Sequence, residues 1–136
     1  LRENRIPVGV LCSPMIPMIN DMELEHLVEA AAKAGAQSAS YMFLRLPREV
    51  APLFEEWLHA HYPQRAEHVL SLVRQSRGGE LYDSRFGKRF SGEGAFAELL
   101  SQRFKVALKR NGLAQRERFN LDCSAFCPPG GQLSLL

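Results

Sequence analysis

The sequence has few cysteines and no long apolar run, and both shortages narrow the class of protein. No stretch approaches the ~20 apolar residues of a membrane-spanning helix, and the N-terminus lacks the basic, apolar and small-residue regions of a signal peptide. Three cysteines, Cys12, Cys123 and Cys127, are too few for the disulfide framework of a small secreted protein. We therefore expect a cytoplasmic protein with free thiols and no membrane partner.

What the chain does contain is a globular composition. Its 136 residues are 46% hydrophobic and 24% charged, which suits one domain with a modest core. The net charge of +2 conceals an asymmetry: residues 1–73 carry six Lys and Arg against nine Asp and Glu, whereas residues 74–136 carry eleven against six. A basic second half suits nucleic acid or a phosphate-bearing ligand, but a solvated surface is the commoner reason for such a bias.

The first third of the chain predicts a strand, a helix and a second strand. Residues 6–12 are apolar on both alternating faces, which favours a strand buried inside a parallel sheet. Asn20 and Glu23 have the spacing of a capping box, apolar residues then recur at helical spacing, and Gly35 ends the pattern. Residues 37–46 again have the composition of a buried strand. This order is that of a right-handed crossover between parallel strands.

The chain after the second strand predicts mainly helices. Apolar residues recur at helical spacing over residues 50–61, about 64–75 and about 95–110. Between the last two helices, residues 76–94 form a loop with five glycines, longer than the ~12–15 residues beyond which loops are usually functional or disordered. The predicted organisation is a strand–helix–strand part over residues 1–47, a helical extension over 48–118 and an extended surface tail over 119–136.

Two strands buried on both faces do not make a stable sheet alone, because their outer edges leave backbone hydrogen-bonding groups unpaired. The chain also begins with Leu1, in a stretch that has the character of the last turn of a helix. We therefore expect the remaining strands to lie upstream, with this chain as the C-terminal fragment of a longer polypeptide.

Five segments, taken in order, carry a family resemblance: GVLCSPMIPMIND, AGAQSASYMFLRLP, FEEWLHAHYP, RGGELYDSRFGKRFSGEG and the ending QLSLL. Together they resemble the C-terminal portion of radical S-adenosylmethionine (radical SAM) proteins, in the bacterial subfamily related to spore photoproduct lyase. The resemblance covers essentially the whole chain. It implies an α/β fold in which the two strands are the last two parallel strands of a partial (β/α)6 TIM-like barrel, joined by a crossover helix and followed by a mostly helical C-terminal extension.

The resemblance also implies a function for the parent protein. Such enzymes reductively cleave S-adenosylmethionine with a [4Fe–4S] cluster to generate a 5′-deoxyadenosyl radical, and the substrate here is undefined. The family holds its cluster with a Cys-x3-Cys-x2-Cys loop, which this sequence lacks, and Cys123 with Cys127 repeats only its first spacing. We expect this chain alone to bind neither cofactor and to be inactive, with no catalytic residue of its own. The implied partner is the upstream barrel half of the same polypeptide.

The predicted cofactor site lies where the two strands end, since ligands of parallel sheets bind at the carboxyl ends of strands. Residues after the first strand supply an apolar slot for adenine, or simply a Pro-rich entry to the helix. Residues after the second strand could supply a backbone edge to adenine, with the Arg45 guanidinium binding a carboxylate or phosphate. The alternative is that this strand only closes the barrel and that Arg45 forms an ion pair within the protein. The six predicted residues are Ser13, Pro14, Met15, Leu44, Arg45 and Leu46.

A second hypothesis concerns the long basic loop. Aromatic and basic residues alternate there in a way that suits stacked bases and phosphates, although an ordered loop pinned by its aromatics would look the same. The function would then be a non-catalytic helical binding module for nucleic acid or a protein partner. The four histidines are not clustered, so no metal site is predicted. The residues of this tentative nucleic-acid site are Tyr82, Arg85, Lys88 and Arg89.

Overall fold

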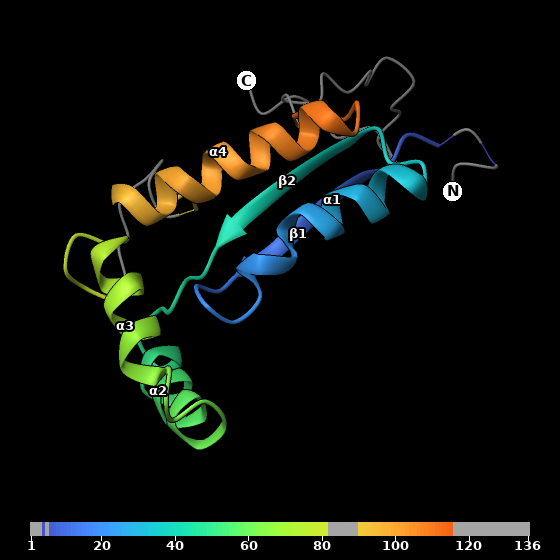
Figure 1. The fold of residues 1–136 in the computed structure, drawn as a ribbon. Helices are drawn as coiled ribbons and strands as arrows, with labels where there is room; N and C mark the ends of the chain where they lie inside the picture. The colour runs from blue at the N-terminus through green and yellow to red at the C-terminus, as the bar shows by residue number, and fades with distance from the viewer. Residues whose placement is uncertain (1–3, 5, 82–89, 116–136) are drawn as a thin grey trace, which may run out of the picture.

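A parallel sheet and four α-helices make up the part of the chain that the computed structural model describes, residues 4, 6–81 and 90–115 (Figure 1). Strand β1 (Gly9–Met15) pairs in parallel with β2 (Ser38–Phe43), and β2 pairs in parallel with the two-residue β3 (Ala114–Gln115). The strand order is β1-β2-β3, so β2 is central. The predicted α/β class and the parallel strand–helix–strand unit are confirmed. None of the helices in the described ranges is long and apolar enough to cross a membrane.

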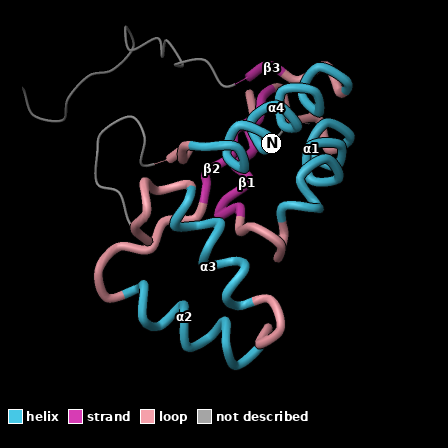
Figure 2. The backbone as a smooth tube through the Cα atoms, turned by 60° about the vertical axis from the view of Figure 1, so that its left-hand side comes forward, coloured by secondary structure: helices cyan, strands magenta, loops and turns pink. Residues whose placement is uncertain are grey.

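Two helices cover one face of the sheet. Helix α1 (Leu24–Lys33) connects β1 to β2, and α4 (Gly94–Arg110) lies beside it (Figures 1 and 2). Their apolar faces meet the inward-facing side chains of both long strands in one continuous core. The buried members of this core are Cys12, Met15, Leu24, Val28, Ala39, Phe43, Leu100, Phe104, Ala107, Leu108 and Leu113.

The expectation that the first strand is buried on both faces is wrong for the part of the chain that the structure describes. Cys12 is buried beneath the helices, whereas Leu11, which points to the opposite face, exposes 49% of its surface. Both α1 and α4 lie on the Cys12 side, so neither of these helices covers Leu11. The strand is also displaced along the chain: it begins at Gly9 and continues through Met15, with an irregularity in its pairing after Cys12.

The predicted capping box is also wrong. A 3-10 turn, η2 (Asp21–Glu23), precedes α1, and Asn20 makes no side-chain capping bond. Instead its Oδ1 accepts a hydrogen bond from the Ile16 amide at 2.7 Å, and its Nδ2 donates to the Pro14 carbonyl at 2.9 Å. Asn20 therefore closes the loop after β1 and is not available to cap the helix.

Arg103 on α4 ties this helix to the start of α1. Its Nε and Nη2 each donate to a carboxylate oxygen of Glu25 at 2.8 Å, a bidentate pair. Nη2 also donates to the Asp21 carbonyl at 2.8 Å, and Nη1 donates to the Asp21 carboxylate at 3.2 Å. The hydrogen bond from Arg103 holds the pKa of Glu25 below its ordinary value. The cluster joins segments that are about eighty residues apart in sequence.

Replacing Arg103 with methionine is expected to lower the free energy of unfolding at pH 7 by roughly 1–2 kcal/mol, because the lost bonds are charge-assisted but partly exposed. Since the pKa of Glu25 is lowered in the folded state, its contribution is present above the unfolded pKa and is lost as pH falls through the folded one. Urea unfolding at pH 7 and at about pH 3 should show the difference between wild type and variant shrinking in acid. Lys105→Met, an exposed site on the same helix, is the control; a difference that persists in acid would contradict the assignment.

A second, smaller core lies beyond the carboxyl ends of the strands. Helices α2 (Val50–His61) and α3 (Ala66–Gln75) form a hairpin there (Figures 1 and 2), which confirms two predicted helices, the second starting two residues later than expected. The face of α2 that was predicted to be apolar is only partly covered, since Leu53 and Trp57 are exposed. The buried members of this core are Leu44, Leu46, Leu58, Ala66, Val69, Leu70 and Val73.

The predicted helical extension contributes to the sheet as well. Helix α4 ends at Arg110, two residues before the positive-φ Gly112 (φ 64°), and Leu113 then returns to the core ahead of β3. The sequence did not predict β3. The whole of the predicted tail, residues 119–136, lies outside the described residues, and Cys123 and Cys127 with it.

Candidate functional site

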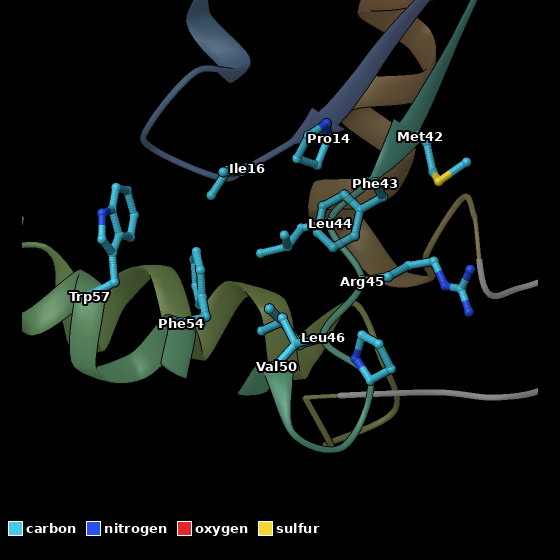
Figure 3. A pocket seen from close by; sticks show the side chains of 11 residues that line it. Pro14, Ile16, Met42, Phe43, Leu44, Arg45, Leu46, Val50, Phe54 and Trp57 are labelled. Carbon is cyan, nitrogen blue, oxygen red and sulfur yellow. The ribbon is translucent and has the colours of Figure 1, made fainter. Parts of the chain in front are cut away.

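A pocket of about 650 Å3 opens at the carboxyl ends of β1 and β2 (Figure 3). The loop after β1 forms one side, α2 forms another, and the segment that follows β2 runs between them. This volume lies in the middle of the ~300–1,000 Å3 range of small-molecule sites. The residues that line it are Pro14, Ile16, Met42, Phe43, Leu44, Arg45, Leu46, Pro47, Val50, Phe54 and Trp57.

The structure brings four of the six predicted cofactor-binding residues together in this pocket: Pro14, Leu44, Arg45 and Leu46. The other two do not line it. Ser13 and Met15 both lie within β1, where the pairing irregularity between Cys12 and Met15 interrupts the alternation of side chains between the two faces. Met15 is buried in the core under α1 and α4, and Ser13 is exposed outside the pocket lining.

Backbone hydrogen bonds fix the strand-end segment on which the pocket is built. The Leu44 amide donates to the Met15 carbonyl at 3.0 Å, which ties this segment to the end of β1. The Phe43 amide donates to the Phe90 carbonyl at 2.8 Å. The Leu44 carbonyl is also engaged, since it accepts a hydrogen bond from Arg77 Nη2 at 2.7 Å. Within the predicted segment Leu44 to Leu46, the backbone edge for a ligand is therefore that of Arg45 and Leu46.

Arg77, two residues after the end of α3, is the residue that sequence reasoning missed. It exposes only 3% of its surface, and its Nη2 donates to the Leu44 carbonyl at 2.7 Å and to the Phe43 carbonyl at 3.4 Å. Its guanidinium also lies 5.2 Å from the centre of the Phe43 ring. Arg77 thus anchors the strand end from behind the pocket. The available signal was an arginine between a helix end and two glycines, which resembled the other basic residues of the loop.

Two aromatic side chains on α2, Phe54 and Trp57, form what we call the aromatic wall. Their ring centres are 5.7 Å apart and their planes differ by 30°. Figure 3 shows both rings rising from α2 towards the loop that carries Ile16. The Trp57 ring also contacts the rings of His61 and Tyr62, with a distance of 5.5 Å between ring centres in each pair. The wall is therefore held in place by neighbouring rings, while Trp57 remains 40% exposed.

The pocket interior is almost uncharged. Among the described residues that line it, Arg45 alone carries a charge. The Arg45 guanidinium lies 5.1 Å from the centre of the Phe90 ring, and in Figure 3 it points away from the aromatic wall. The stem of Arg45 thus lines the pocket while its charged group lies at the end farther from α2.

The tentative nucleic-acid site lies outside the described residues, and the described residues are unsuited to holding an iron–sulfur cluster. Tyr82, Arg85, Lys88 and Arg89 belong to residues 82–89, which the structure does not describe. Burial raises the pKa of the Cys12 thiol, and this disfavours the thiolate that an iron–sulfur cluster needs. Across the described ranges, no three His, Cys, Asp or Glu side chains gather as a metal site would require. These residues therefore do not fit a cluster.

Comparisons with protein-family models, curated proteins and solved structures return no match to this chain. The likeness to radical SAM proteins thus rests on the order of the five sequence segments and stays a prediction.

Proposed function

We propose that this chain forms part of the nucleoside-binding wall of a radical SAM enzyme whose cluster ligands lie elsewhere in a longer polypeptide. One observation carries the proposal. The pocket lies at the carboxyl ends of two parallel strands and is lined by four of the six residues that the sequence predicts to bind S-adenosylmethionine. This edge of a parallel sheet is where such folds bind ligands.

The arrangement of helices supports a barrel parentage. Both helices that pack on the sheet lie on one face, as they do around a (β/α) barrel, where the other face points inward. Leu11 is exposed on that other face, in keeping with a strand whose second covering layer comes from outside the described residues. We infer that β1 and β2 are the fifth and sixth strands of a partial (β/α)6 barrel.

The pocket residues suit the binding of a flat nucleoside. Pro14 and Leu44 offer apolar contact to a purine, and the backbone of Arg45 and Leu46 offers the polar edge that orients it. The Asn20 side chain accepts a hydrogen bond from the Ile16 amide and donates one to the Pro14 carbonyl, which holds the loop in place before a ligand binds. The loop therefore loses little conformational entropy on binding. When bound elsewhere in the polypeptide, the cluster would supply the reducing electron. This chain positions the nucleoside.

The upstream coding sequence is the first test. We expect a Cys-x3-Cys-x2-Cys motif there, in a loop after a predicted strand. If the complete polypeptide has no such motif, the radical SAM proposal fails, and the alternative of a binding module for nucleic acid or protein takes its place.

The second test changes the pocket itself in the complete, cluster-loaded polypeptide. Val50 lines the pocket and is part-exposed on α2, so Val50→Phe should fill the pocket and weaken S-adenosylmethionine binding by about tenfold or more. Leu53→Phe enlarges an exposed side chain on the same helix outside the pocket lining and should leave the affinity unchanged. Calorimetry measures the affinity, and the iron content shows that the cluster is intact. Unchanged binding in Val50→Phe would place the nucleoside elsewhere.

A further inference from the structure

We propose that the α2 side of the pocket is a second subsite, which takes an uncharged planar aromatic ring stacked on Trp57. This inference goes beyond the nucleoside site and does not depend on it. The predicted nucleoside position uses the strand ends, whereas the second subsite uses α2 and the facing loop. Its ligand would be the ring of a substrate or of another small molecule.

The orientation of Trp57 is the first argument. An exposed tryptophan on a helix normally samples several rotamers, but this ring is packed against Phe54, His61 and Tyr62 with centroid distances of 5.5 to 5.7 Å. A large aromatic surface that is already ordered loses little side-chain entropy when a ligand stacks on it. The ring also lines a pocket of small-molecule size.

The opposite side of the subsite is ordered as well. Ile16 faces the aromatic wall across the pocket in Figure 3, and its amide is held by Asn20. The same loop is tied to the α2–α3 connection, because Arg65 Nη1 donates to the Met18 carbonyl at 3.3 Å. Two apolar surfaces from separate segments are thus held facing one another. Such a slot favours a flat ligand.

The charges of the residues that line the pocket determine whether the bound ring should be cationic, anionic or uncharged. Within the part of the chain that the structure describes, the pocket lining includes no acidic side chain, so a cationic ring would gain a contact with the Trp57 face but no counter-charge. The Arg45 guanidinium lies towards the other end of the pocket, so an anionic ring at the aromatic wall would lose hydration without an ion pair. An uncharged ring has neither cost.

The sole tryptophan of the chain makes the test direct, because its indole N–H gives a single side-chain signal in a 15N-correlated NMR spectrum. The probes are three naphthalenes of one size: 2-naphthalenemethanol, 2-naphthoate and 2-naphthamidine. We expect the neutral alcohol to shift the Trp57 signal and to bind about tenfold more tightly than either ion. Tightest binding by the amidine would indicate a cation–π site, and tightest binding by the carboxylate would indicate control by Arg45. Either result, or no binding of the alcohol, would overturn the proposal.

Two variants distinguish binding at the subsite from nonspecific binding to exposed apolar surface. Trp57→Leu should weaken binding of 2-naphthalenemethanol by about tenfold, as followed by the main-chain amides of Ile16 and Leu46. Leu53→Ala, which removes a more exposed apolar side chain on the same helix outside the pocket, should have no effect. Equal effects of the two changes would refute a defined subsite. If the alcohol binds as expected while Val50→Phe leaves S-adenosylmethionine binding unchanged, the nucleoside proposal alone is lost.

Discussion

Replacing Arg77 with methionine is expected to destabilise the protein by roughly 3 kcal/mol, because two buried backbone carbonyls lose their charged donor and each such loss costs about 1–3 kcal/mol. The carbonyls belong to Phe43 and Leu44, at the end of the central strand. Methionine keeps most of the apolar volume against the Phe43 ring, so the effect reports mainly on the hydrogen bonds. Urea unfolding followed by circular dichroism gives the free energy.

A graded series sharpens this experiment. Arg77→Lys keeps the charge but has no planar fork, so it should fall between wild type and Arg77→Met. Arg110→Met removes an exposed arginine from the last turn of α4 and should change stability by no more than about 0.5 kcal/mol. If Arg77→Met costs no more than the Arg110 control, then Arg77 does not anchor the strand end.

Truncating Phe104 to alanine should cost roughly 3–5 kcal/mol, the usual range for removing a buried phenylalanine. Its side chain is 2% exposed, and its ring meets Tyr41 edge-on at 4.9 Å, which makes it a main contact between α4 and β2. The loss combines buried apolar area, the ring pair and the cavity left behind. Val106→Ala on the same helix, at a position that is 48% exposed, serves as the control. A loss below about 1 kcal/mol for Phe104→Ala would mean that α4 does not depend on this contact.

Much of this fold could be predicted because its signals are periodic. The apolar spacing identified α2, α3 and α4 within a few residues of their ends, and Gly35, with φ of 88°, ends the α1 region as expected. The general rule for parallel sheets then placed a site at the strand ends, where the pocket lies. What was predicted well thus depends on repeated local patterns and on one topological rule.

The features that were missed depend on single contacts between distant segments. A two-residue strand such as β3 has no period to detect. Asn20 and Glu23 have the letters of a capping box, but the Asn20 side chain bonds the loop that precedes it, and sequence spacing does not separate the two uses. The same holds for Arg77, whose acceptors lie more than thirty residues earlier in the chain. The role of such residues is set by contacts with segments distant in sequence, which local sequence patterns do not reveal.

The register of the sheet has a consequence for the order in which the molecule assembles. Ser38 pairs with Gly9, 29 residues before it, and with Ala114, 76 residues after it. Closing the longer loop costs only about 0.9 kcal/mol more than closing the shorter one, since this entropy grows with the logarithm of loop length. The pairing of a two-residue strand contributes too little free energy to offset the entropy lost on closing the loop. Strand β3 therefore depends on the α4 contacts that bring it to β2. The first two strands and their helix can therefore form as an early unit, and the third strand joins only once the last helix is in place.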